Sequence, residues 1–219
     1  MPELVAIPIS FFELSIDYDH VTFKLLLDRA SVLQSIYDAL KPWSIRVDDL
    51  EPITTGKITE QGINIKLPLQ RVVFFFSAAG CKFTREGVDW PNAEETIAIA
   101  DAALTALTES AGITLGPKNT SISIHLQPKT LPFIDLLKPL IPSQLAALDH
   151  SPPTTIASVV KWGDDHKVTI DGSGALANAL FLRFERRFPS TATYQEIANR
   201  LQKDEQDLFQ ILGVEEDQG

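Results

Sequence analysis

Apolar residues along this chain follow two different spacings, which alternate in blocks. Two stretches, 93–111 and 194–212, repeat apolar side chains every three or four residues, the spacing of one helix face. Each follows a capping-box pattern, with a glutamate three positions after Asn92 and after Thr193, and each stops at a glycine. We predict two long helices, with apolar faces formed by Ile97, Ala100, Leu104, Leu107 and Ala111 and by Tyr194, Ile197, Leu201, Leu208 and Ile211.

Shorter helices and many strands fill the rest of the chain. Residues 29–42 have helical spacing, with Ser31 placed to cap the start and Pro42 to end the helix. Residues 131–148 are also helical in pattern but contain internal prolines, so we expect two short helices there. The remaining apolar runs lie between turn residues, as strands do, and they are residues 4–17, 43–53, 56–69, 71–78, 81–86, 119–129, 154–162, 166–172 and 179–188.

The order of these elements divides the chain into two similar halves. Residues 1–112 follow the order β-α-β-β-β-β-α, and residues 113–219 the order β-α-β-β-β-α. Grouped strands with helices between the groups are typical of an α+β fold, with a curved, mainly antiparallel sheet packed by helices. This order resembles the TATA-binding-protein-like superfold, and the alternative is a single helix-grip domain. The resemblance implies no function, and we expect the two halves to form one compact body.

The stretch RVVFFFSAAGCKFTREGVDW, residues 71–90, contains the most apolar strand. In a strand, Phe74 and Phe76 share one face and Phe75 lies on the other, so both faces are apolar. We expect a central strand covered on both faces; the alternatives are that one face lines a ligand cavity or a subunit interface. Trp90 is either an aromatic anchor at such a site or a packing residue near the start of the next helix.

The sequence gives little support for a catalytic, metal-binding or phosphate-binding site. Cys81, the single cysteine, follows a turn and enters a strand, so we expect a small buried side chain and not a nucleophile. His166 follows two aspartates, but three consecutive residues of a tight turn rarely converge on one metal ion. The glycine spacings of phosphate-binding loops are absent. We therefore expect no catalytic residue, no metal and no cofactor.

One basic patch interrupts this acidic chain, in the segment FLRFERRFP at residues 181–189. On a strand, Arg183, Glu185 and Arg187 point to the same side. These arginines are candidates for contact with an anion or an interface. Alternating charges more simply form cross-strand ion pairs on a solvated face, and that is the interpretation we prefer.

Charge and composition narrow the class of partner. The chain has 219 residues and a formal net charge of −10, and an acidic surface repels phosphate backbones and anionic lipids. The amino-terminal sequence lacks a signal-peptide pattern, and no apolar run reaches the length of a membrane span. With a single cysteine, these features predict a cytoplasmic protein that binds neither nucleic acid nor membrane.

The preferred hypothesis is a non-catalytic protein that binds a partner protein, or a second copy of itself, through a sheet edge or an apolar sheet face. One alternative is a carrier of a small apolar molecule or lipid, with a cavity lined by Phe74, Phe76 and Trp90. A second alternative is a hydrolase or transferase that uses Cys81 or His166.

Overall fold

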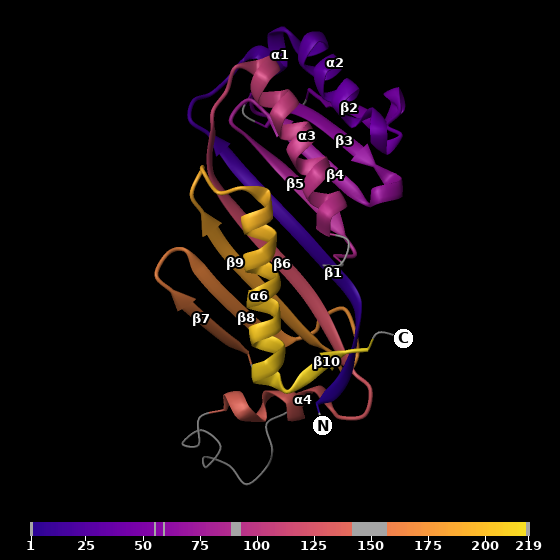
Figure 1. The fold of residues 1–219 in the computed structure, drawn as a ribbon, viewed down its shortest axis with the longest axis vertical. Helices are drawn as coiled ribbons and strands as arrows, with labels where there is room; N and C mark the ends of the chain where they lie inside the picture. Colours follow the sequence, from indigo (N-terminus) through magenta and orange to yellow (C-terminus); the bar gives the residue numbers. More distant parts are fainter. Residues whose placement is uncertain (1, 55, 59, 89–92, 142–156, 218–219) are drawn as a thin grey trace. The chain divides into compact units, whose positions relative to one another are not determined.

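The structure is a computed structural model that describes residues 2–217 except 55, 59, 89–92 and 142–156 (Figure 1). Its α-helices are α1 Lys24–Leu27, α2 Arg29–Leu40, α3 Ala93–Ala111, α4 Phe133–Leu137 and α6 Tyr194–Leu212. Its strands are β1 Glu3–Tyr18, β2 Leu50–Ile53, β3 Gly62–Leu67, β4 Val72–Ser77, β5 Gly80–Glu86, β6 Leu115–Pro128, β7 Ser158–Trp162, β8 His166–Gly172, β9 Leu180–Phe188 and β10 Val214–Glu216.

The strands form one curved, unclosed sheet in the order β2-β3-β4-β5-β1-β6-β9-β8-β7, with β10 added in parallel to β1. This arrangement confirms the predicted α+β class, with a mainly antiparallel sheet packed by helices. The first strand of each sequence half, β1 and β6, lies in the middle of this order. The later strands of each half follow outward in reverse chain order. The division of the chain into two similar halves, residues 1–112 and 113–219, stays a prediction.

Two compact units make up the chain, and each is assembled from several segments. Unit 1 comprises residues 1–10, 122–186 and 200–219, and unit 2 comprises residues 11–121 and 187–199. The long strands β1 and β6 and the helix α6 each contribute residues to both units.

The core of unit 2 forms around one face of β4. Phe74 and Phe76 are fully buried and stack with ring centroids 5.4 Å apart. They belong to the same apolar cluster as the inward faces of α2 and α3, which supply residues such as Ile36 and Leu104. Val73 and Phe75 on the opposite face are half-buried. The expectation that both faces of this strand are covered is therefore wrong, because solvent reaches the second face in part.

Helix α2 of unit 2 differs from the sequence prediction in its capping residue, whereas helix α3 has the predicted bounds. Helix α2 begins at Arg29, so Ser31 lies inside the first turn and does not cap the helix. The bounds of α3 agree with the predicted range, and Gly112 with φ +65° ends it, but Asn92 lies outside the described residues. Ile99 is buried on α3, whereas Ile97 is half-buried, because the face turned to the sheet is shifted slightly around the helix.

Helix α6 begins in unit 2 and continues in unit 1, where its Asp204 meets Arg186 of β9 and His166 of β8 (Figure 1). The predicted capping box is present, since Thr193 N–H donates to Glu196 (2.8 Å) and Glu196 N–H donates to Thr193 Oγ1 (3.2 Å). The prediction for the end of the helix is wrong at Ile211, which is exposed, while Leu212 is buried in its place. After α6 the chain continues into β10, which pairs with β1.

The two faces of β4 differ in burial, which a pair of substitutions measures. We expect Phe74→Ala to lower the free energy of unfolding by about 3–5 kcal/mol, the usual cost of removing a fully buried aromatic ring. The neighbouring variant Phe75→Ala removes a half-buried ring from the open face and is expected to cost about 1 kcal/mol. Urea unfolding of both variants checks this, and equal losses would contradict the assignment of faces.

Candidate functional site

The two outer strands of the sheet differ in how well they resist pairing with another chain. At one edge, β2 has four residues, and Pro52 in the middle lacks the N–H that a further strand would need. At the other edge, β7 has no proline and presents three large apolar side chains to solvent. Val159, Val160 and Trp162 are 61 %, 43 % and 53 % exposed. An edge strand of this kind favours pairing with an added strand.

The backbone of β7 supplies the hydrogen-bonding groups for such pairing. It pairs with β8 on one side, with Trp162 opposite His166 and Val160 opposite Val168. No described strand lies on its other side. In an antiparallel pair, every second residue turns its N–H and C=O away from the partner. About half of the five β7 residues therefore direct backbone groups outward, where the described part of the chain places no partner strand.

A row of side chains runs across the sheet from helix α6 to this edge. The register places Trp162 opposite His166 and His166 opposite Arg186, so all three point to the face that α6 covers. The Trp162 and His166 rings stack with centroids 4.7 Å apart and planes 19° apart. Arg186 Nη2 donates to His166 Nδ1 (3.1 Å). The exposed tryptophan at the edge is thus joined through the histidine to the buried face of the sheet.

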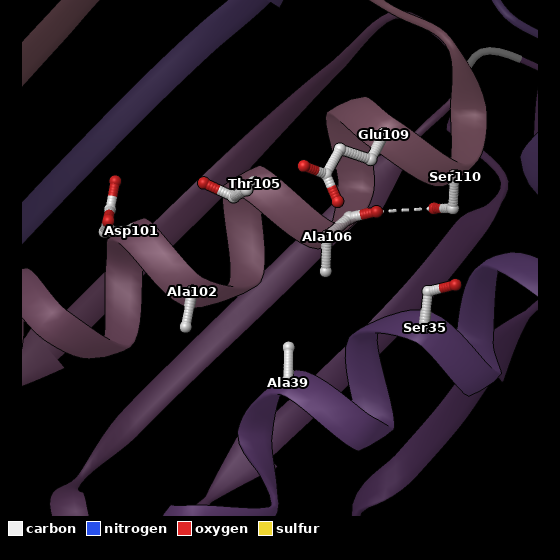
Figure 2. Close-up of a pocket in the computed structure, with 8 residues that line it drawn as sticks. All are labelled: Ser35, Ala39, Asp101, Ala102, Thr105, Ala106, Glu109 and Ser110. Atoms are coloured by element: carbon white, nitrogen blue, oxygen red, sulfur yellow. Dashed lines mark hydrogen bonds between the residues drawn. The ribbon is translucent and has the colours of Figure 1, made fainter.

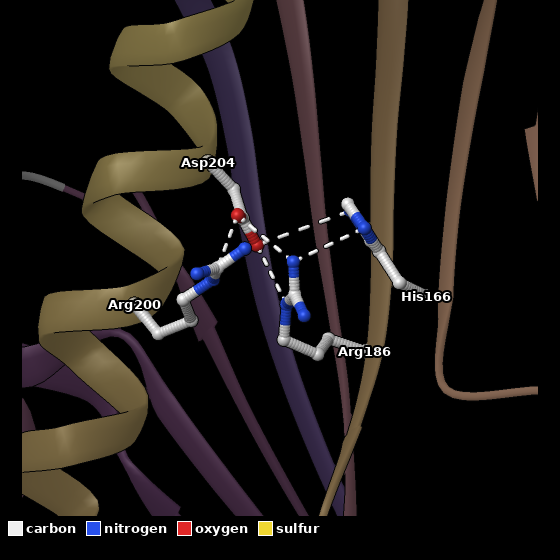
Figure 3. Close-up of polar contacts among 4 residues, drawn as sticks. All are labelled: His166, Arg186, Arg200 and Asp204. Carbon is white, nitrogen blue, oxygen red and sulfur yellow. Dashed lines mark hydrogen bonds and ion pairs between the residues drawn. The ribbon is translucent and has the colours of Figure 1, made fainter. Parts of the chain in front are cut away.

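This row ends at Asp204 on α6, whose side chain is 5 % exposed (Figure 3). Arg186 contacts both carboxylate oxygens, with distances of 2.7 Å from Nε to Oδ2 and 2.9 Å from Nη2 to Oδ1. Arg200, one helical turn before Asp204, contributes a third contact of 3.0 Å from Nε. Removing a single partner of such a buried pair typically costs about 3–5 kcal/mol, because it leaves an uncompensated charge. The cluster therefore fixes β9 and β8 against α6.

His166 is held in its neutral form by these neighbours. Burial lowers the pKa of the imidazole most, and the positive charge of Arg186 lowers it further. The carboxylate of Asp204 raises the pKa, but by less than these two effects lower it. An arginine can only donate, so Nδ1 accepts and the proton of the neutral ring is on Nε2. Nε2 lies 3.9 Å from Asp204 Oδ2, beyond hydrogen-bond distance. Protonation at Nδ1 would remove the acceptor for Arg186 and place two positive charges together.

The arginines predicted as interface candidates lie apart from this row. Arg183 points to the opposite face, where Glu185 contacts both Arg183 (3.5 Å) and Lys167 (2.6 Å). The contact of Lys167 with Glu185 is a cross-strand ion pair of the kind that the sequence pattern favoured, whereas Arg183 meets Glu185 along the same strand. Arg187 is exposed on β9 and belongs to unit 2.

The aromatic candidates do not form a site with β7 either. Phe74 and Phe76 are part of the unit 2 core, and Trp90 lies outside the described residues. A carrier cavity against these two rings would require them to line a hollow, and both are fully buried against other core residues.

Neither Cys81 nor Ser173, a hydroxyl that the structure places beside His125, has the surroundings of a nucleophile. Cys81 is buried, and burial raises the pKa of its thiol to about 12. Ser173 lies 2.8 Å from His125 Nδ1, but its oxygen already accepts hydrogen bonds from the backbone N–H groups of Ala175 and Leu176. Both lone pairs of that hydroxyl are thereby engaged, so Ser173 organises the loop after β8 and is poorly placed to attack a substrate.

A shallow groove of about 350 Å³ separates helices α2 and α3 in unit 2 (Figure 2). Small side chains such as Ala39 and Ala102 line its floor. The hydroxyl of Ser110 donates within its own helix to the carbonyl of Ala106 (2.6 Å). The groove follows from the close approach of two helices with small facing residues, and Asp101 and Glu109 also line it.

Two buried charges were missed by the sequence analysis. Asp204 interrupts the apolar face of α6, and a single acid on a helix carries no signal of burial until the arginine opposite is known. Lys118 on β6 is 4 % exposed; its ammonium donates to the carbonyl of Ser190 and lies 5.5 Å from the centroid of the Tyr194 ring. Burial lowers the pKa of Lys118.

Comparisons with known proteins do not add to this geometry. No protein-family model matches the chain, and no curated protein matches it. Across the described part of the chain, no group of three or more histidine, cysteine or acidic residues is arranged to hold a metal ion. Within the same residues, none of the helices is long and apolar enough to cross a bilayer.

The neutral state of His166 predicts a pH dependence of stability. The pKa is near 6.5 in the unfolded chain and lower in the folded chain, so the unfolded state binds more protons as the pH falls through 6.5. Stability is therefore expected to be greatest above this value and to decline at lower pH. His125, whose pKa burial also lowers, contributes with the same sign.

Urea unfolding between about pH 5 and pH 8 measures this slope. We expect His166→Gln, whose amide oxygen can still accept from Arg186, to flatten it. The double variant His166→Gln with His125→Gln should flatten it further. A slope that is the same in wild type and both variants would contradict the assignment.

Proposed function

We propose that this protein binds a partner polypeptide by strand addition, with β7 as the receiving edge. The observation that carries the proposal is the exposed, proline-free strand Ser158–Trp162 at the end of the sheet. Backbone hydrogen bonds along β7 supply affinity in this mode of recognition, and pockets or ridges formed by alternate side chains supply specificity.

The side chains of β7 favour an extended and partly apolar segment as the ligand. Val160 and Trp162 share the face that α6 covers elsewhere in unit 1, and Val159 and Lys161 point to the other face. Both faces of an added strand would thus meet one apolar residue at least. The stack of Trp162 on His166 limits the freedom of the indole ring before binding, which lowers the entropy lost on association.

A pair of proline variants tests whether the outward backbone of β7 is the binding element. In Val159→Pro and Val160→Pro, the substitutions fall on adjacent residues, so one removes an N–H directed to β8 and the other an N–H directed outward. The variant that keeps the wild-type melting temperature is the one that affects the outer edge. The probe is an extended peptide selected on the immobilised protein from a library of short random peptides.

The outer-edge proline variant should bind the selected peptide at least about tenfold more weakly than wild type. Leu69→Lys provides the matched control, since Leu69 is an exposed apolar residue, 80 % accessible, in unit 2. The control is expected to bind as wild type does. If the outer-edge variant retains full affinity for the selected peptide, β7 is not the receiving edge.

A further inference from the structure

The sequence of β7 is complementary to itself in antiparallel pairing. The strand has five residues, and the register centred on Val160 pairs all five with a second copy. Val160 then lies opposite Val160 of the other copy, and Trp162 lies opposite Ser158, a large residue against a small one. Lys161 lies opposite Val159, so this register places no like charges opposite each other. A register centred on Lys161 would oppose two ammonium groups.

We propose that the strand accepted by β7 is β7 of a second copy of this chain, paired antiparallel about Val160. This inference rests on the proposed function and names its partner. In the dimer, each Trp162 ring is diagonal to Val160 of the other copy, a separation that an aromatic side chain spans. The four side chains form one apolar cluster on the helix-covered face, where Val160 and Trp162 are now exposed.

The charges around the strand permit this approach. Lys161, the charged residue within β7, is already paired with Asp164 of its own turn at 2.7 Å. The whole chain has a net charge of −10, so two copies repel each other at long range. Salt at about 0.1 M screens such repulsion beyond about 10 Å. Dimerisation through β7 should therefore strengthen as salt is added, whereas binding to a basic partner would weaken.

A single-cysteine cross-link tests the register directly. In the proposed dimer, residue 160 is the one position that faces itself, at a spacing that a disulfide can bridge. We expect Val160→Cys to form a disulfide dimer under mild oxidation at least about tenfold faster than Val159→Cys or Leu69→Cys, because pairing raises the effective thiol concentration. The native Cys81 is buried with a raised pKa, so it does not compete.

Sedimentation of the wild-type chain supplies the second readout. The expected result is a monomer–dimer equilibrium whose dimer fraction rises between about 0.05 M and about 0.5 M salt. Cross-linking of Val160→Cys at the rate of Leu69→Cys would overturn the inference, whether the wild type is monomeric or dimerises through another surface. In either case the proposed function stands if the outer-edge proline variant still loses the selected peptide, and it falls if that variant keeps it.

Discussion

An open sheet leaves a row of unpaired backbone N–H and C=O groups at each of its two edges. The organisation of this protein depends on which of these edges its residues protect from pairing with another strand. Strands β1 and β6 lie in the interior of the strand order, and the short strands β2 and β7 lie at its ends. Pro52 blocks β2, and Glu51 there pairs with Lys66 at 2.8 Å. β7 has no proline, and apart from Lys161, which pairs with Asp164, its valines and tryptophan face solvent. That asymmetry is the basis for assigning a binding role to one edge.

The row from Asp204 to Trp162 connects this edge to the rest of unit 1. A buried carboxylate with two arginines contributes little net stability over an apolar replacement, because desolvation offsets most of the attraction. Its effect is geometric: the bidentate contact with Arg186 sets the position of β9 against α6, and Arg186 in turn orients His166 under Trp162. An edge strand that would otherwise be free to move is thus presented in a defined orientation.

Much of the fold could be predicted from the pattern of the chain, and the site could not. The period of apolar residues and the glycine stops located α3 and α6 to the residue, since those signals are local. Burial of Asp204 depends on Arg186, which precedes it by 18 positions in the chain. The two residues meet only when strand β9 and helix α6 pack together, so the local sequence carries no sign of the contact. The exposure of Val160 likewise follows from strand order. Val160 is on the edge strand β7 and is exposed, whereas Val168, opposite it on β8, is buried. Strand β4, which contains Phe74, is the most apolar strand by composition. The rings on one face pack inside unit 2, and the residues on the other face are only half-buried.

The central claim is that the outward backbone groups of β7 are available for pairing, and amide hydrogen exchange of residues 158–162 tests it most directly. In dilute protein, the account predicts that the amides directed to β8 exchange slowly and the alternate, outward amides exchange rapidly. At high protein concentration, or with the selected peptide added, the outward amides should become protected. Protection of every β7 amide in dilute protein would contradict the account, because the edge would then already be paired within the chain.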